Sequence, residues 1–84
     1  MTVPEIPVLY FAQLRDRLGR DADHYTLPAA SDTTILLALV AARHPLAAAI
    51  VARCRVAVDH QFVTGAFPLL ATSEVALIPP VSGG

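Results

Sequence analysis

The chain has 84 residues and a mass of 8.9 kDa, which allows a single domain with one modest core. The chain contains six arginines, no lysine and seven acidic residues, which give a net charge of −1. This charge offers no basis for binding nucleic acid or an anionic membrane surface. The single cysteine excludes an internal disulfide framework and a cysteine-rich zinc site.

The apolar content is high for so small a domain, at 55% of residues with a mean hydropathy of +0.56. The longest apolar run, Ile35–Ala42, is far shorter than the roughly 18–20 residues that a membrane span needs. Met1–Glu5 shows neither the basic segment nor the apolar segment of a signal peptide, so we expect a cytoplasmic protein. The apolar surplus therefore predicts a surface that another protein covers.

The first third of the chain predicts two strands separated by a short helix. Ile6–Phe11 is almost wholly apolar, which is typical of a strand buried on both faces. Ala12–Leu18 has two leucines four residues apart and is followed by a glycine, which indicates a helical turn. His24–Leu27 predicts the second strand, which a proline ends.

The middle of the chain predicts two helices. Several candidate N-cap residues, in Ser31–Thr34, precede an apolar helix over Ile35–Arg43. We expect its core stripe to consist of Ile35, Leu36, Leu39 and Val40. Pro45 marks a break, and Leu46–Arg53 follows as a second helix.

The last third predicts three strands and their connections: Arg55–Asp59, a turn at His60-Gln61, a short strand from Phe62, a covering loop at Phe67–Ala71, and Glu74–Ile78. Alternation in the first of these strands places Val56 and Val58 in the core and Ala57 outside. Helices packed on one face of a mixed sheet make the predicted fold an α+β domain.

Conventional catalytic sets are absent from the sequence. His24, His44 and His60 lie in three separate segments without metal-ligand spacing, so we expect surface or turn histidines and no metal site. Cys54 has no activating base beside it in the sequence, and we expect a half-buried packing residue.

The end of the chain is unusual. A stiff Pro79-Pro80 pair precedes Val81, Ser82, Gly83 and Gly84, and these four residues reach roughly 13 Å when extended. The two glycines carry no side chains and accept unusual backbone angles, so they suit a narrow channel. The sequence therefore predicts a domain over residues 1–80 and an extended tail over 81–84.

Several segments resemble the small subunits of molybdopterin synthase. Val8–Asp16 is similar to the opening strand and turn of that family, and Glu74–Gly84 is similar to its closing strand and tail. Thr33–Pro45 and Val56–Asp59 resemble the family's helix and the strand after it, so the likeness covers nearly the whole chain from Val8. The sequence departs from the family at Ala71–Ser73, where an acidic-glycine-acidic turn is common.

This resemblance implies the ubiquitin-like β-grasp fold, with about five strands, helices on one face and a flexible Gly-Gly tail. It further implies a sulfur carrier in molybdenum cofactor synthesis. A ubiquitin-activating-like enzyme would consume ATP to adenylate Gly84, and a sulfur donor such as a cysteine desulfurase or rhodanese would convert it to a thiocarboxylate. Residues Pro80–Gly84 would then enter the large synthase subunit within a heterotetramer and give sulfur to cyclic pyranopterin monophosphate. No permanently bound cofactor is implied.

A carrier of this kind needs an apolar surface for its partners, and our candidates are Phe11, Phe62, Phe67 and Ile78. Three alternative functions share the same tail. They are sulfur transfer to thiamine or tRNA, attachment to lysines as a protein modifier, and a non-catalytic interaction module with an incidental Gly-Gly. The segment Phe11–Arg15 argues against the first of these alternatives.

Overall fold

The computed structural model describes residues 5–80, which form one five-stranded sheet and four helical segments. The elements are β1 (Glu5–Tyr10), α1 (Ala12–Leu18), β2 (Ala22–Thr26), α2 (Thr33–Arg43), the 3₁₀ segment η1 (Pro45–Ala47), α3 (Ala48–Arg53), β3 (Arg55–Val58), β4 (Gln61–Val63) and β5 (Val75–Ile78). Every predicted helix and strand is present, with its ends within two residues of the predicted positions.

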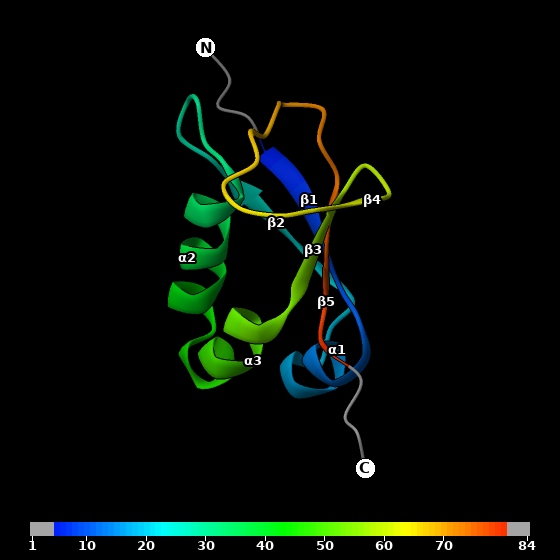
Figure 1. The fold of residues 1–84 in the computed structure, drawn as a ribbon. Helices are drawn as coiled ribbons and strands as arrows, with labels where there is room; N and C mark the ends of the chain where they lie inside the picture. Colours follow the sequence, from blue (N-terminus) through cyan, green and yellow to red (C-terminus); the bar gives the residue numbers. More distant parts are fainter. Residues whose placement is uncertain (1–4, 81–84) are drawn as a thin grey trace.

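The strand order across the sheet is β2-β1-β5-β3-β4. β1 and β5 run parallel to each other, and the other neighbouring pairs are antiparallel. In Figure 1, α2 and α3 lie on one face of the sheet and α1 lies at the end from which the last described residues leave it. The prediction of an α+β domain with a mixed sheet is therefore confirmed. None of the helices described is by itself long and apolar enough to span a membrane.

The core lies between the helices and one face of the sheet. In β1, Ile6, Val8 and Tyr10 are buried, whereas Pro7 and Leu9 on the opposite face are partly exposed. The prediction of a strand buried on both faces is wrong, because neither α2 nor α3 covers that second face, here called the outer face. A strand alternates its side chains between two faces, so only one set reaches the helices.

Helix α2 begins two residues earlier than its apolar run. Asp32 caps it, since the Ile35 backbone N–H donates to Asp32 Oδ1 at 3.0 Å. Thr33, Leu36 and Val40 then share the buried face at helical spacing. Ile35 is 38% exposed, and its predicted place in the core stripe is wrong because the buried face is centred on Thr33, Leu36 and Val40, from which Ile35 is turned away.

A two-residue turn joins β3 to β4. Asp59 and His60 both have positive φ, 50° and 71°, as a type I′ hairpin requires, so the turn lies one residue earlier than predicted. Asp59 also holds the start of β5. Its N–H donates to the Glu74 carbonyl, and its Oδ1 accepts from the Glu74 N–H, each at 2.9 Å.

The segment Ala71–Ser73 makes its turn without glycine. The Ser73 N–H donates to the Leu70 carbonyl at 3.0 Å, and the Leu70 N–H donates to Ser73 Oγ at 2.8 Å. None of these residues has a positive φ, so the chain does not need the glycine that is common at this point in the resembling family. The departure in sequence is therefore accommodated by a serine side chain.

A buried polar cluster joins β1, β2 and the end of α2. Tyr10 donates its hydroxyl to Asp23 Oδ2 at 2.8 Å, and the His44 Nε2–H donates to the same oxygen at 3.0 Å. The Tyr25 hydroxyl lies 2.6 Å from that of Tyr10, and Arg20 Nη1 lies 2.9 Å from Asp23 Oδ1. Each oxygen of this nearly buried carboxylate therefore has a polar partner.

The cluster keeps Asp23 ionised. Burial alone would raise the pKa of this carboxyl, but the hydrogen bonds from His44 and Tyr10 and the charges of Arg20 and Arg43 hold it below its ordinary value. The pKa of Tyr10 is raised by burial and by its neighbours, so its hydroxyl proton stays in place to donate.

The cluster makes stability depend on acid pH. A carboxyl whose pKa is lowered by folding stabilises the protein above its unfolded-state value of about 3.9, and this contribution is lost as the pH falls through the folded value. We expect Asp23→Asn to lower the free energy of unfolding by about 1–3 kcal/mol at pH 7 and by less at pH 3, measured by urea denaturation. Asp21→Asn, at an exposed neighbour, should behave like the parent. An unchanged pH dependence in Asp23→Asn would contradict this assignment.

Candidate functional site

The two segments that carry the family resemblance meet at one end of the sheet. β1 and β5 are paired in parallel, with Leu9 opposite Ala76 and Tyr10 opposite Leu77, so both strands finish at the same end (Figure 1). The chain enters α1 after β1 and reaches Pro79-Pro80 after β5. This end of the molecule, here called the tail end, is where residues 81–84 begin.

The start of the tail is held against the helices. Pro79 is buried and Pro80 is exposed, and the Pro80 carbonyl lies 3.5 Å from Gln13 Nε2 of α1. Pro80 also borders a small hollow with Ile50 and Arg53 of α3. The direction of the chain is therefore fixed as far as Pro80, while the predicted tail residues Val81, Ser82, Gly83 and Gly84 lie outside the described residues.

An apolar hollow of about 250 Å³ lies on the outer face and reaches the tail end. It is lined by Leu9, Phe11, Ala57, His60, Phe62, Glu74, Ala76 and Ile78. Phe11 and Phe62 are 40% and 52% exposed, and Ile78 is partly exposed. The structure therefore brings three of the four predicted interface residues together in one place, here called the outer-face hollow.

The floor of the outer-face hollow is made by small side chains. Ala57 lies opposite Ala76 on one side and opposite Phe62 on the other. Ala57 points to the outer face, as its alternation with Val56 and Val58 predicts, and it is nevertheless buried because its single methyl group is shielded by larger neighbours. Arg55 places its guanidinium over the face of the Phe62 ring, 3.9 Å from the ring centre, in a cation–π contact.

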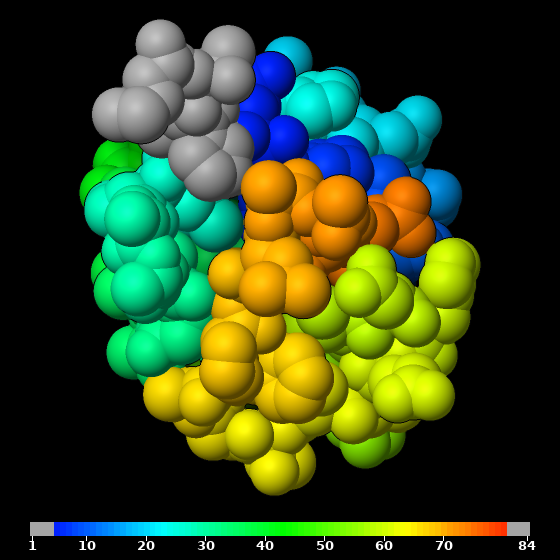
Figure 2. Space-filling view, turned by 90° about the horizontal axis from the view of Figure 1, so that it is seen from above, coloured from blue at the N-terminus to red at the C-terminus, as the bar shows by residue number. Residues whose placement is uncertain are grey.

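Phe67 lies apart from the other three candidates. Its N–H donates to Thr33 Oγ1 at 3.0 Å, and its carbonyl accepts from the Thr33 N–H at the same distance. Figure 2 shows the β4–β5 loop, in yellow and orange, between the start of α2 and the β3–β4 hairpin. Phe67 is exposed, but it does not line the outer-face hollow.

The sequence analysis did not single out Leu9 and Ala76, which also line the outer-face hollow. The available signal was the alternation of each strand. Once Val8 and Tyr10 are assigned to the core, Leu9 between them must face the other side. The apparent continuity of the apolar run in β1 concealed this alternation.

The titratable and nucleophilic side chains of residues 5–80 do not form a catalytic set. His24 and His60 are exposed, as predicted, whereas His44 is half-buried and bonded to Asp23. Over the same residues no three His, Cys, Asp or Glu side chains gather in a way that would hold a metal ion.

Cys54 is the half-buried packing residue that the sequence predicts. Its Sγ donates to the Ile50 carbonyl at 3.3 Å, and burial raises the pKa of its thiol to about 11. At neutral pH the side chain is a thiol, and the thiol is a poor nucleophile compared with the thiolate.

Comparison with known families decides the classification. The model of the ThiS family matches residues 8–84, which include the second half of β1, all of β5 and the tail. The chain belongs to the ThiS family. The match extends to the last residue of this ThiS-family protein, Gly84.

Two relatives have the same printed name, molybdopterin synthase sulfur carrier subunit. The one from Chlamydomonas reinhardtii is 35% identical over 82 residues, which cover 95% of this chain and 99% of the relative. The one from Mycosarcoma maydis is 34% identical over 88 residues, which cover 96% and 95%. The ThiS-family chain and these relatives therefore correspond along their whole lengths.

Solved structures share the fold. A molybdopterin converting factor subunit 1 from Pyrococcus furiosus aligns with a TM-score of 0.81 at 25% identity, covering 95% of this chain and all of that one. Haloferax volcanii SAMP1 aligns at 0.82 with 22% identity, covering 95% and 99%. A chain in the complex of subunits 1 and 2 of the Helicobacter pylori molybdopterin-converting factor aligns at 0.71 with 18% identity, covering 95% and 99%. The predicted ubiquitin-like β-grasp fold is confirmed.

The environment of Cys54 predicts low reactivity. We expect a thiol reagent such as iodoacetamide to modify folded protein much more slowly than urea-unfolded protein at pH 7.5, and the rate to rise as the pH approaches 11. Cys54→Ala should lose at most about 1 kcal/mol of stability and keep its partner-dependent activity. Rapid alkylation of the folded chain at neutral pH, followed by mass spectrometry, would contradict this view of the thiol.

Proposed function

We propose that this ThiS-family protein is the sulfur carrier subunit of molybdopterin synthase. The observation that carries the proposal is the position of Pro79-Pro80, which leaves the sheet beside an exposed apolar hollow at the same end of the molecule. The names and full-length match of the Chlamydomonas and Mycosarcoma relatives support the same function.

The chemistry that this function requires begins at the carboxylate of Gly84. A carboxylate is a poor acyl donor at neutral pH, and reaction with ATP converts it to an acyl adenylate with release of pyrophosphate. The outer sulfur of a persulfide on a donor such as a cysteine desulfurase or rhodanese then displaces AMP and forms an acyl disulfide. A second thiol cleaves the S–S bond of this intermediate, which leaves the thiocarboxylate on Gly84 and a disulfide between that thiol and the donor. The carrier itself needs only a reachable terminus for these steps.

The remaining steps require a partner that accepts the tail. The Helicobacter complex contains both subunits of its converting factor, which supports the large synthase subunit as the partner of this chain. In the proposed heterotetramer, Pro80–Gly84 enters the large subunit and sulfur passes to cyclic pyranopterin monophosphate. Phe11, Phe62 and Ile78 of the outer-face hollow would hold the domain in place beside the channel.

The alternative functions use the same tail with different partners. A carrier for thiamine or tRNA would also form a thiocarboxylate, and a protein modifier would join Gly84 to a lysine. The likeness to Haloferax volcanii SAMP1 shows the fold and does not separate these functions. Both close relatives are named as synthase subunits, and this observation favours the first function.

The proposal makes Gly84 the acceptor of sulfur. We expect the full chain, incubated with its adenylating enzyme, ATP and a sulfur source, to gain the mass that replaces one oxygen by one sulfur. Deletion of Gly84, or addition of one residue after it, should abolish this gain and leave the unfolding curve unchanged, because the change lies beyond the described fold. Molybdopterin formation by the Gly84-deleted chain, assayed with the large subunit, would refute the assignment.

The outer-face hollow predicts where the large subunit binds. Phe62→Asp places a charge in the exposed apolar hollow and should weaken binding by more than about 1 kcal/mol, measured by calorimetry. Leu70→Asp is the matched control, because Leu70 is exposed in the β4–β5 loop and does not line this hollow. Equal affinities for the two variants would show that the outer-face hollow is not the contact.

A further inference from the structure

The charges of the molecule are divided between its two ends. All six arginines lie toward the tail end: Arg15 and Arg17 in α1, Arg20 after it, Arg43 at the end of α2, Arg53 at the end of α3, and Arg55 at the start of β3. Antiparallel pairing places the start of β3 beside the end of β5, so Arg55 lies at the same end as Pro79.

The carboxylates are divided in the opposite sense. Asp16, Asp21 and Asp23 lie toward the tail end, so six arginines against three aspartates leave a net side-chain charge of +3 there. The other four side-chain carboxylates, of Glu5, Asp32, Asp59 and Glu74, lie toward the far end and give −4. The small net charge of the chain therefore conceals a strongly polar distribution.

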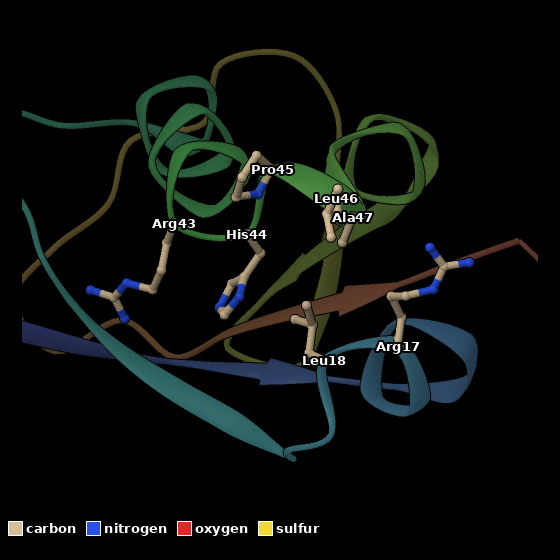
Figure 3. A pocket seen from close by; sticks show the side chains of 7 residues that line it. All are labelled: Arg17, Leu18, Arg43, His44, Pro45, Leu46 and Ala47. Carbon is tan, nitrogen blue, oxygen red and sulfur yellow. The ribbon is translucent and has the colours of Figure 1, made fainter.

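A second hollow, here called the corner hollow, lies at the cationic end. It has a volume of about 330 Å³ and is lined by Arg17, Leu18, Arg43, His44, Pro45, Leu46 and Ala47. In Figure 3, Arg17 and Arg43 lie on opposite sides of it, with Leu18, Leu46 and Ala47 between them. Leu46 is 90% exposed. The corner hollow thus has an apolar floor, and the side chains of Arg17 and Arg43 leave it on opposite sides, each with its guanidinium group directed outward (Figure 3).

The two guanidinium groups differ in how far they are engaged within the chain. Arg43 donates to the His24 carbonyl at 3.1 Å, lies 3.9 Å from the Tyr25 ring centre and is 4.0 Å from Asp23 Oδ1, so its position is fixed, while its side chain remains 44% exposed. Arg17 has no ion pair among residues 5–80. A ligand that reaches both sides of the corner hollow would find one preorganised cation and one uncommitted cation.

We propose that the corner hollow is a second docking point, separate from the outer-face hollow, for a protein segment that carries a carboxylate on each side of a large apolar side chain. The separation of Arg17 and Arg43 fits an extended segment better than a single small anion, which requires cations that converge. The inference rests on the proposed function for the owner of this segment, the large synthase subunit.

The charge distribution would also orient the chain as it approaches its partner. An acidic segment on the partner attracts the +3 end and repels the −4 end, so the chain approaches with its tail end first. Contact at the corner hollow and at the outer-face hollow would hold the domain from two sides of the tail end. The docked tail then has little freedom to swing away from the channel.

The test compares two leucines in the full-length chain. Leu46→Asp places a carboxylate in the corner hollow, and we expect it to weaken binding of the purified large subunit by about tenfold or more. Leu70→Asp carries the same substitution at an exposed leucine of the far end and should change affinity by less than about threefold. Circular dichroism and urea denaturation establish that both variants are folded.

A second pair of variants tests the charge. Arg17→Gln removes the charge and should both weaken binding and reduce the dependence of the affinity on salt. Arg17→Lys keeps the charge and should retain most of the affinity and most of its salt dependence, because a solvent-exposed ionic contact depends more on the charge than on the planar shape of the guanidinium group. Equal affinities for Leu46→Asp and Leu70→Asp, or no effect of Arg17→Gln, would overturn the docking point while leaving the Gly84 chemistry untouched. If the parent chain does not bind the large subunit at all, both the docking point and the proposed function fail.

Discussion

The parallel pairing of β1 with β5 is the constraint on which the rest of the molecule depends. It brings the first and last strands of the described chain side by side and makes them finish at the same end. The segment Phe11–Gln13, the start of the tail at Pro79-Pro80 and the open part of the outer face are therefore neighbours, although most of the chain separates them in sequence. If the tail and the apolar hollow lay at opposite ends of the molecule, one partner could not easily bind the hollow and accept the tail at the same time.

Two features of the composition, the high apolar content and the absence of lysine, can be explained by this arrangement. The apolar surplus is used on the outer face, where small alanines and exposed phenylalanines make a surface that a partner can cover. The lack of lysine leaves no side-chain ε-amine in the chain, so a Gly84 carboxyl activated as we propose could not be lost as an amide to a lysine of its own chain. Arginine supplies the positive charge without that chemical risk, because the guanidinium stays protonated.

The sequence predicts the features that depend on local patterns of residues. It does not predict the positions of side chains that depend on contacts with residues far away in the sequence. Apolar runs and turn residues give the order of elements, and Phe11, Phe62 and Ile78 prove to share one surface. The buried position of Asp23 depends on partners 13 and 21 residues away, which no local pattern shows. Ile35 lies outside the core because the buried face of α2 is centred on Thr33, Leu36 and Val40, and Phe67 is held away from the other aromatics by its hydrogen bonds with Thr33. Hydrophobicity alone does not show which face of a helix the sheet will cover, or where a loop will be held.

The position of β5 between β1 and β3 also governs how the chain can fold. Within the sheet, the ribbons β1–β2 and β3–β4 are joined to each other by β5 alone, and Val8 must find Val75 across most of the chain. Such non-local pairings form slowly, because a long loop must close before they contribute. Until β5 inserts, both ribbons present unpaired N–H and C=O groups that can recruit strands from other molecules. The strand that leads into the tail is therefore also the one whose arrival protects a newly made chain from aggregation.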